Sequence, residues 1–98
     1  MKTLNYDLAI VGGGVAGVSS ALSASRLGLK VILIEKGSIL GGLATSGLIN
    51  WFEPLCDSKG HQILSSMVEE LFNLSIKYGY KTYNENWKES KERKATWF

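Results

Sequence analysis

The sequence predicts an α/β fold, with a β-α-β unit of a parallel sheet followed by an amphipathic helix. Three observations predict it: two short aliphatic runs, a helical stretch that joins them after a glycine-rich turn, and a helical apolar pattern beyond residue 62. With 98 residues, 45% of them hydrophobic and 20% charged, the chain has an ordinary globular composition and room for one small domain.

The two aliphatic runs cover residues 8–11, Leu-Ala-Ile-Val, and residues 31–34, Val-Ile-Leu-Ile. Continuous runs of this kind are typical of strands that are buried on both faces of a parallel sheet. We therefore expect further strands and helices to cover them, and one β-α-β unit leaves the domain incomplete.

The segment from Val15 to Leu27 predicts the connecting helix, because it contains no proline and only one glycine. Gly17, Ala21 and Ala24 recur at helical spacing and form a face of very small side chains. Such a face allows the helix axis to approach the sheet closely. Gly28 is suited to end the helix in a left-handed conformation.

Residues 62–78 predict an amphipathic helix that ends at Gly79. Its apolar positions are Ile63, Leu64, Met67, Val68, Leu71, Phe72 and Leu74, and its polar ones are Glu69, Glu70, Asn73 and Lys77. Packing within the fold is the favoured role of this helix over partner binding. Residues 80–83 alternate as in a short strand, and the alternating charges of residues 84–98 indicate a solvated or flexible face, or one paired with absent sequence.

The glycines Gly12, Gly14 and Gly17 form a G-x-G-x-x-G motif between the first strand and the helix, where a dinucleotide-binding turn is expected. The first glycine permits the tight turn, the second lets a pyrophosphate approach, and the third brings the helix against the strand. The backbone N–H groups near Val15 and Ala16 and the helix dipole favour a phosphate there. The alternative is a glycine-rich turn without a ligand.

Glu35 ends the second strand, 21 residues after Gly14. An acid at this place is suited to accept hydrogen bonds from both hydroxyls of an adenosine ribose, and it would repel a 2′-phosphate, which argues against NADP. Taken alone, Glu35 would be interpreted as a solvated acid at a strand end.

A second glycine pair, Gly41-Gly42, follows Glu35 after five residues and continues as Leu-Ala-Thr-Ser-Gly-Leu to Leu48. Here the chain resembles the FAD-dependent oxidoreductases of the two-dinucleotide-binding-domain type, most closely the subgroup with a G-G-x-A-T-x-G-L stretch. The fumarate reductase and succinate dehydrogenase flavoproteins are more distantly similar. The resemblance covers residues 6–52 and extends to about residue 80.

This resemblance implies a Rossmann-like FAD/NAD(P)-binding fold and a non-covalent FAD, whose flavin accepts a hydride from a small-molecule substrate or reduced nicotinamide. It implies these cofactor-binding residues: Gly12, Gly14, Val15, Ala16, Gly17, Glu35, Lys36, Gly41, Gly42, Ala44 and Thr45. The hydroxyls of Thr45 and Ser46 are equally suited to bonds within their own loop. Residues 43–55 contain no cysteine, which disfavours the flavin disulfide reductases.

We therefore expect residues 1–98 to be the N-terminal part of one FAD-binding domain, supplying the lobe that holds the ADP half of FAD. Alone, the chain should be inactive and bind FAD weakly or not at all. Two alternatives stay open: a non-catalytic nucleotide-binding or assembly module, and an NAD-binding unit.

Composition argues against other partners. A net charge of +2 is too small to indicate nucleic acid, and no apolar stretch reaches the roughly 18 residues of a membrane span. The single cysteine, Cys56, excludes a disulfide framework within the chain and favours a cytoplasmic setting. We interpret Cys56 as structural and His61 as a loop residue rather than a proton donor, and no residue pattern indicates a metal site.

Overall fold

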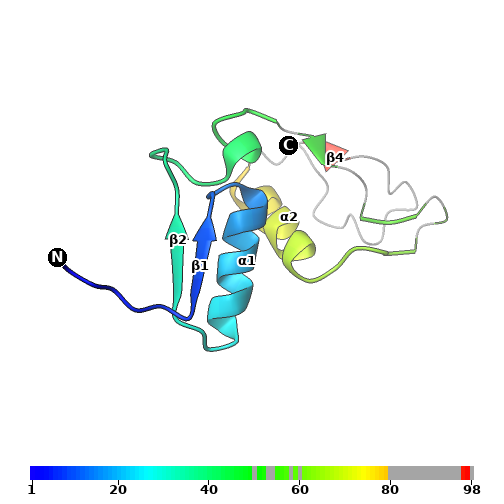
Figure 1. The fold of residues 1–98 in the computed structure, drawn as a ribbon. Helices are drawn as coiled ribbons and strands as arrows, with labels where there is room; N and C mark the ends of the chain where they lie inside the picture. The colour runs from blue at the N-terminus through cyan, green and yellow to red at the C-terminus, as the bar shows by residue number, and fades with distance from the viewer. Residues whose placement is uncertain (50, 53–54, 58, 60, 80–95, 98) are drawn as a thin grey trace. The chain divides into compact units, whose positions relative to one another are not determined.

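The computed structural model describes residues 1–49, 51–52, 55–57, 59, 61–79 and 96–97 (Figure 1). The chain divides into two compact units, residues 1–49 and residues 50–98. The predicted strand at residues 80–83 and most of the charged tail lie outside the described residues.

The first unit is the predicted β-α-β arrangement. Strands β1 (Leu8–Val11) and β2 (Val31–Ile34) pair in parallel, with Leu8 opposite Val31 and Val11 opposite Ile34. Helix α1 (Val15–Arg26) connects them and lies against the sheet (Figure 1). The strand boundaries and the parallel β-α-β topology of one Rossmann-like unit are confirmed.

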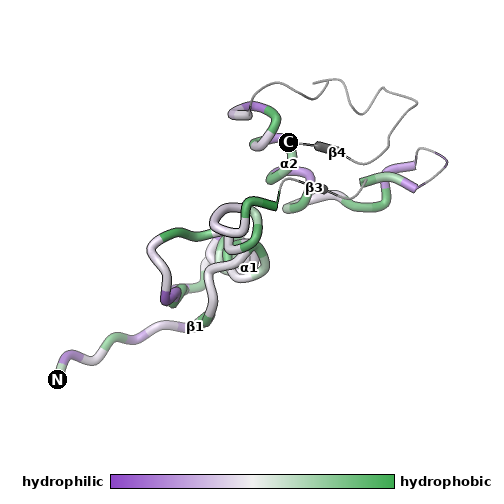
Figure 2. Tube along the Cα trace, turned by 90° about the horizontal axis from the view of Figure 1, so that it is seen from above, coloured by the Kyte–Doolittle hydropathy of each residue, from purple (hydrophilic) through white to green (hydrophobic). Residues whose placement is uncertain are grey.

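Helix α1 lies close to the sheet because of its small side chains. Ala24 is buried and Gly17 and Ala21 are half-buried. The tube of α1 is mostly pale in Figure 2, as expected for a helix in which alanine, glycine and serine predominate. Gly28 has a φ of +88° and ends the helix, as predicted.

The expectation that both strands are buried on two faces is wrong for the described residues. The side chain of Val11 is 82% exposed and that of Ile34 is 48% exposed. Within the described part of the first unit, α1 covers one face of the sheet and no further strand pairs with β1 or β2. The apolar pattern of a parallel sheet is present, whereas the described residues supply a covering layer on one face only.

The second unit contains α2 (Met67–Tyr78) and a pair of two-residue antiparallel strands, β3 (Trp51–Phe52) and β4 (Thr96–Trp97). Its apolar cluster comprises Leu55, Cys56, Phe72 and Ile76, and Phe72 is fully buried. The sequence pattern did not predict the β3–β4 pair.

Helix α2 begins at Met67, five residues later than predicted. The preceding residues have other partners: Gln62 bridges to Cys56, and the N–H groups of Ile63 and Leu64 donate to the carbonyl of Leu55. Ser66 then has a φ of +63°, which helical backbone excludes. Gly79 ends the helix as predicted. In the described part of the chain, no helix has the length and apolarity to cross a membrane.

Candidate functional site

The turn at residues 12–14 joins the carboxyl end of β1 to the first turn of α1. It is called the phosphate turn here because the sequence predicts phosphate binding at this place. Gly12 has a φ of +101°, and its N–H donates to the carbonyl of Ile34 at 2.8 Å, which extends the β1–β2 ladder into the turn. A left-handed backbone of this kind favours glycine.

The N-terminus of α1 opens from this turn with hydrogen-bond donors that the helix itself does not use. Gly14 is the N-cap residue, and the helix starts its ladder with the Val18 N–H donating to the Gly14 carbonyl at 2.9 Å. No side chain caps this end, and its first turn contains no acidic residue. The N–H groups of residues 15–17 therefore have no partner within the helix, and the dipole adds positive potential.

Gly17 and Gly14 differ in what surrounds them. A Cβ on Gly17 would overlap the carbonyl oxygen of Gly12 and lie 3.6 Å from Ile10 Cγ2, so the close approach of helix and strand requires glycine. A Cβ on Gly14 would meet no atom within 4 Å, and its φ of −67° suits any residue. The fold alone therefore does not explain a glycine at position 14.

Glu35 directly follows β2, and its carboxylate lies at the phosphate turn. Its Oε2 accepts the N–H of Gly13 at 2.5 Å, and its Oε1 accepts the N–H of Gly37 at 2.8 Å. The N–H groups of Gly37 and then Gly13 hold the pKa of this carboxyl below its ordinary value, with a smaller effect of the charge on Lys36. The structure thus places the predicted acid beside the predicted turn, ionised at neutral pH.

The second glycine pair contacts the first motif. Gly41 has a φ of +99° and donates its N–H to the carbonyl of Gly13 at 2.8 Å, and a Cβ on Gly42 would lie 3.2 Å from Gly14 Cα. A short 3-10 helix, η1 (Gly42–Ala44), begins at this point. Two motifs that are separated in sequence therefore form one continuous backbone surface.

A cleft of about 620 Å³ opens beside this surface. Its described lining consists of Glu35, Gly37, Ser38, Ile39, Gly42, Leu43, Ser46 and Gly47. Of the predicted cofactor residues, Glu35 and Gly42 are in this described lining. The others are not: Gly12, Gly14, Val15, Ala16, Gly17, Lys36, Gly41, Ala44 and Thr45. Thr45 instead donates its hydroxyl to the carbonyl of Leu40 at 2.6 Å, a bond within its own loop.

The predicted cofactor residues do not include Gly13 or six residues that line the cleft: Gly37, Ser38, Ile39, Leu43, Ser46 and Gly47. Gly13 occupies a variable position of the motif, yet a Cβ there would lie 2.5 Å from Leu40 Cδ2 and 3.0 Å from Glu35 Cβ. The signal that could have identified it is the run of three consecutive glycines, since the motif needs only two of them.

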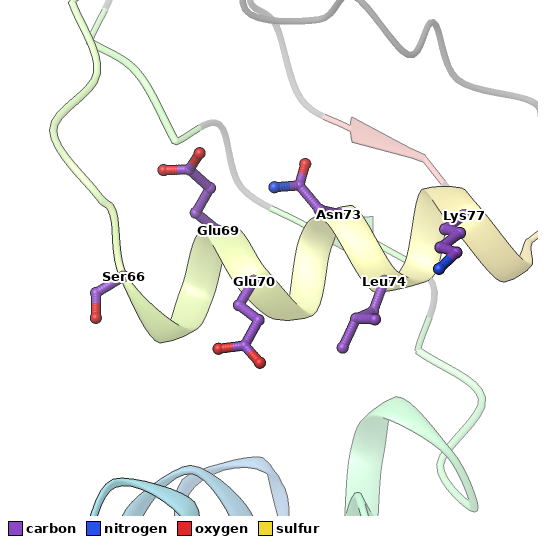
Figure 3. Close-up of a pocket in the computed structure, with 6 residues that line it drawn as sticks. All are labelled: Ser66, Glu69, Glu70, Asn73, Leu74 and Lys77. Carbon is purple, nitrogen blue, oxygen red and sulfur yellow. The ribbon is translucent and has the colours of Figure 1, made fainter. Parts of the chain in front are cut away.

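Two groups of polar residues lie in the described part of the second unit. In the turn before α2, the Asp57 carboxylate lies 3.0 Å from Nδ1 of the exposed His61, and Cys56 is buried. Along α2, a groove of about 460 Å³ is lined by Glu69, Glu70, Asn73 and Lys77 of the predicted polar face, with Ser66 and Leu74 (Figure 3). In the part of the chain that the structure describes, no three potential metal ligands cluster.

Comparison with known proteins gives one family and several relatives. A family model described as FAD dependent oxidoreductase matches residues 7–97. A thioredoxin reductase of Ureaplasma parvum serovar 3 is 32% identical over 80 residues, which is 82% of this chain and 26% of the relative. One component of the anaerobic glycerol-3-phosphate dehydrogenase of Vibrio cholerae is 38% identical over 58 residues, 48% of this chain and 13% of that component. The chain thus spans about a quarter or less of these relatives, and no solved structure matches it.

Proposed function

The chain belongs to the FAD dependent oxidoreductase family, and from this membership we propose that residues 1–49 form the lobe that binds the ADP half of FAD. In this proposal the pyrophosphate lies at the N-terminus of α1 and the adenosine ribose at Glu35. The complete protein is a cytoplasmic FAD-dependent oxidoreductase of the G-G-x-A-T-x-G-L subgroup, and the 98-residue chain alone is not active.

The observation that carries the proposal is the glycine at position 14. Its φ of −67° and the open space around its Cβ position give the fold no need for glycine. A pyrophosphate that must approach the backbone closely gives a reason, because a methyl group would stand between the phosphate and the N–H groups at the start of α1. The residues of the phosphate turn therefore fit the cofactor that the family implies.

Glu35 supports the second half of the proposal. Its carboxylate borders the cleft and is held ionised by backbone N–H groups, which lower its pKa. Ribose hydroxyls are donors that this carboxylate accepts, whereas a 2′-phosphate would bring two like charges together. We therefore expect nucleotides with a free 2′-hydroxyl to bind and 2′-phosphorylated ones to be rejected.

The chemistry of the complete protein comes from the cofactor: bound FAD supplies a flavin ring that accepts a hydride from a small-molecule substrate or reduced nicotinamide. The residues of the phosphate turn, Glu35 and the glycine pair bind and orient the other end of that cofactor. The family favours FAD over NAD. The closeness of Gly42 to Gly14 supports this choice, because it brings the second glycine segment typical of that family to the pyrophosphate site.

The test is an NMR titration of the ¹⁵N-labelled 98-residue chain, which detects even millimolar binding. ADP should shift the amide signals of residues 12–17, and adenosine 2′-phosphate 5′-diphosphate should not at the same concentration. In a second titration FAD should displace ADP at lower concentration than NAD. An equal response to the 2′-phosphorylated nucleotide, or no response of residues 12–17 to ADP, would contradict the proposal.

A further inference from the structure

One side chain connects two backbone segments of the candidate site. The Glu35 carboxylate accepts the N–H of Gly13 in the phosphate turn and the N–H of Gly37 at the start of the loop that leads to the second glycine pair. The two bonds measure 2.5 and 2.8 Å and use different carboxylate oxygens. Glu35 therefore links the turn and the loop while it borders the cleft.

Both linked segments are rich in glycine and would be costly to order. Gly12 and Gly41 have φ values near +100° (+101° and +99°), and glycine loses more conformational freedom on ordering than any other residue. If that freedom were lost only on binding, it would weaken the affinity for a nucleotide. A side chain that orders the segments beforehand removes this cost from the binding step.

The glycine at position 13 fits the same role. A Cβ on Gly13 would lie 3.0 Å from Glu35 Cβ and 3.1 Å from its Oε2, so glycine lets the acid reach the backbone N–H. The phosphate motif itself asks for no glycine at this position. Gly13 and Glu35 thus form a matched pair, 22 residues apart in the sequence.

The two backbone bonds leave acceptor capacity for a ligand. An ionised carboxylate offers about four lone-pair positions on its two oxygens. Gly13 and Gly37 use two of them and the backbone N–H of Lys36 also acts on this carboxylate, so at least one position remains for a ribose hydroxyl. The Glu35 carboxylate can therefore keep its backbone bonds and bind the ribose at the same time.

We propose that Glu35 is a positioning residue, whose carboxylate fixes the phosphate turn and the 37–41 loop in their binding arrangement before the nucleotide arrives and keeps both backbone bonds afterwards. This inference rests on the proposed ADP-binding function. It adds that the acid organises the protein as well as contacting the ribose.

The proposal has a pH dependence with a definite sign. The N–H bonds lower the pKa of Glu35 from the ordinary 4.5, so the folded chain favours the ionised form. The link is complete above pH 4.5 and is lost as the pH falls through the lower folded pKa. Acidification should therefore release Gly13 and Gly37 together.

The experiment follows the amide signals of Gly13 and Gly37 by NMR in the ligand-free 98-residue chain. The expected result is that both signals shift with one common midpoint below pH 4.5 and that both amides exchange slowly with solvent at neutral pH. Glu35→Gln should abolish the shared titration and speed exchange of at least one amide about tenfold, since it loses a bond to a charged group. Separate midpoints, or no titration in the wild-type chain, would overturn the proposal even if the variant does not fold.

A control and a ligand arm complete the test. Asp7→Asn removes another carboxylate that accepts a backbone N–H, that of Lys30 at 2.8 Å, and should leave Gly13 and Gly37 unchanged. With ADP at saturation, both amides should stay protected, and loss of protection would overturn the proposal. If ADP shifts no signal while the ligand-free titration behaves as expected, the proposed function fails and the link itself stands.

Discussion

At the residue scale, the glycines in and beside the phosphate turn show which roles a sequence motif predicts and which it does not. The sequence predicts that Gly12 forms a tight turn and that Gly17 allows close packing, and the left-handed φ of Gly12 and the crowding at Gly17 agree. It does not predict the role of Gly13, because that role depends on a side chain 22 residues away. The use of the Thr45 hydroxyl within its loop was one of two equal alternatives, and only coordinates could separate them.

A matched pair of glycine substitutions separates packing from ligand binding. Gly17→Ala forces a methyl group onto the Gly12 carbonyl and should lower the free energy of unfolding by about 1–3 kcal/mol. Gly14→Ala meets no atom and should change it by less than about 1 kcal/mol, since cap and unfolded-chain effects oppose each other. Urea unfolding of both variants measures the difference, and equal losses would contradict the assignment of close packing to Gly17.

At the element scale, local signals predicted β1, β2 and α1 well. The aliphatic runs, the absence of proline and the glycine after the helix are all contained in a few neighbouring residues. The predicted start of α2 was wrong because residues 62–64 pair with Cys56 and Leu55, and the positive φ of Ser66 excludes helical backbone directly before Met67. The β3–β4 pair joins residues far apart in the sequence, Trp51 and Trp97, over two residues each, a length at which strand periodicity carries no information.

The turn before α2 should depend on the charge of Asp57. The His61 side chain, then the His61 backbone N–H, lower the pKa of this carboxyl from its ordinary 3.8. The stabilisation of this turn by the ionised Asp57 is therefore complete above pH 3.8. It is lost as the pH falls through the pKa of Asp57 in the folded chain. Because Asp57 adjoins the buried Cys56, the only cysteine, thiol labelling reports on the turn.

The measurement is the rate of Cys56 labelling with a dipyridyl disulfide, which reacts at acid pH, relative to the unfolded chain. The relative rate should rise as the pH falls below 3.8 in the wild-type chain. Asp57→Asn should label several-fold faster at neutral pH and lack the acid step, whereas Asp7→Asn should match the wild type. A wild-type rate ratio that does not change with pH would contradict the role of Asp57.

At the scale of the whole molecule, the apolar pattern predicted the parallel sheet but not its surroundings. Val11 and Ile34 are exposed because burial on two faces requires layers that the described residues do not supply. The described part of the second unit has a cluster of four buried residues around Phe72. Each residue of such a small core should carry a large share of the stability.

Phe72 tests this view of the second unit. Phe72→Ala removes a fully buried side chain and should lower the free energy of unfolding by about 3–5 kcal/mol. A loss of this size is enough to unfold a marginally stable unit. Leu74 on the same helix is 43% exposed, so Leu74→Ala should lower the free energy of unfolding by about 1 kcal/mol or less. Circular dichroism during urea unfolding measures both, and similar losses would show that the cluster is not the core of this unit.

The central claim is that a diphosphate lies against the backbone at Gly14, and the affinity of Gly14→Ala for ADP tests it most directly. The NMR titration should show an affinity at least about tenfold below that of the wild-type chain, because the methyl group displaces the phosphate from the helix N–H groups. A change in the free energy of unfolding below about 1 kcal/mol, as expected for this variant, would exclude unfolding as the cause. An undiminished affinity for ADP would contradict the claim.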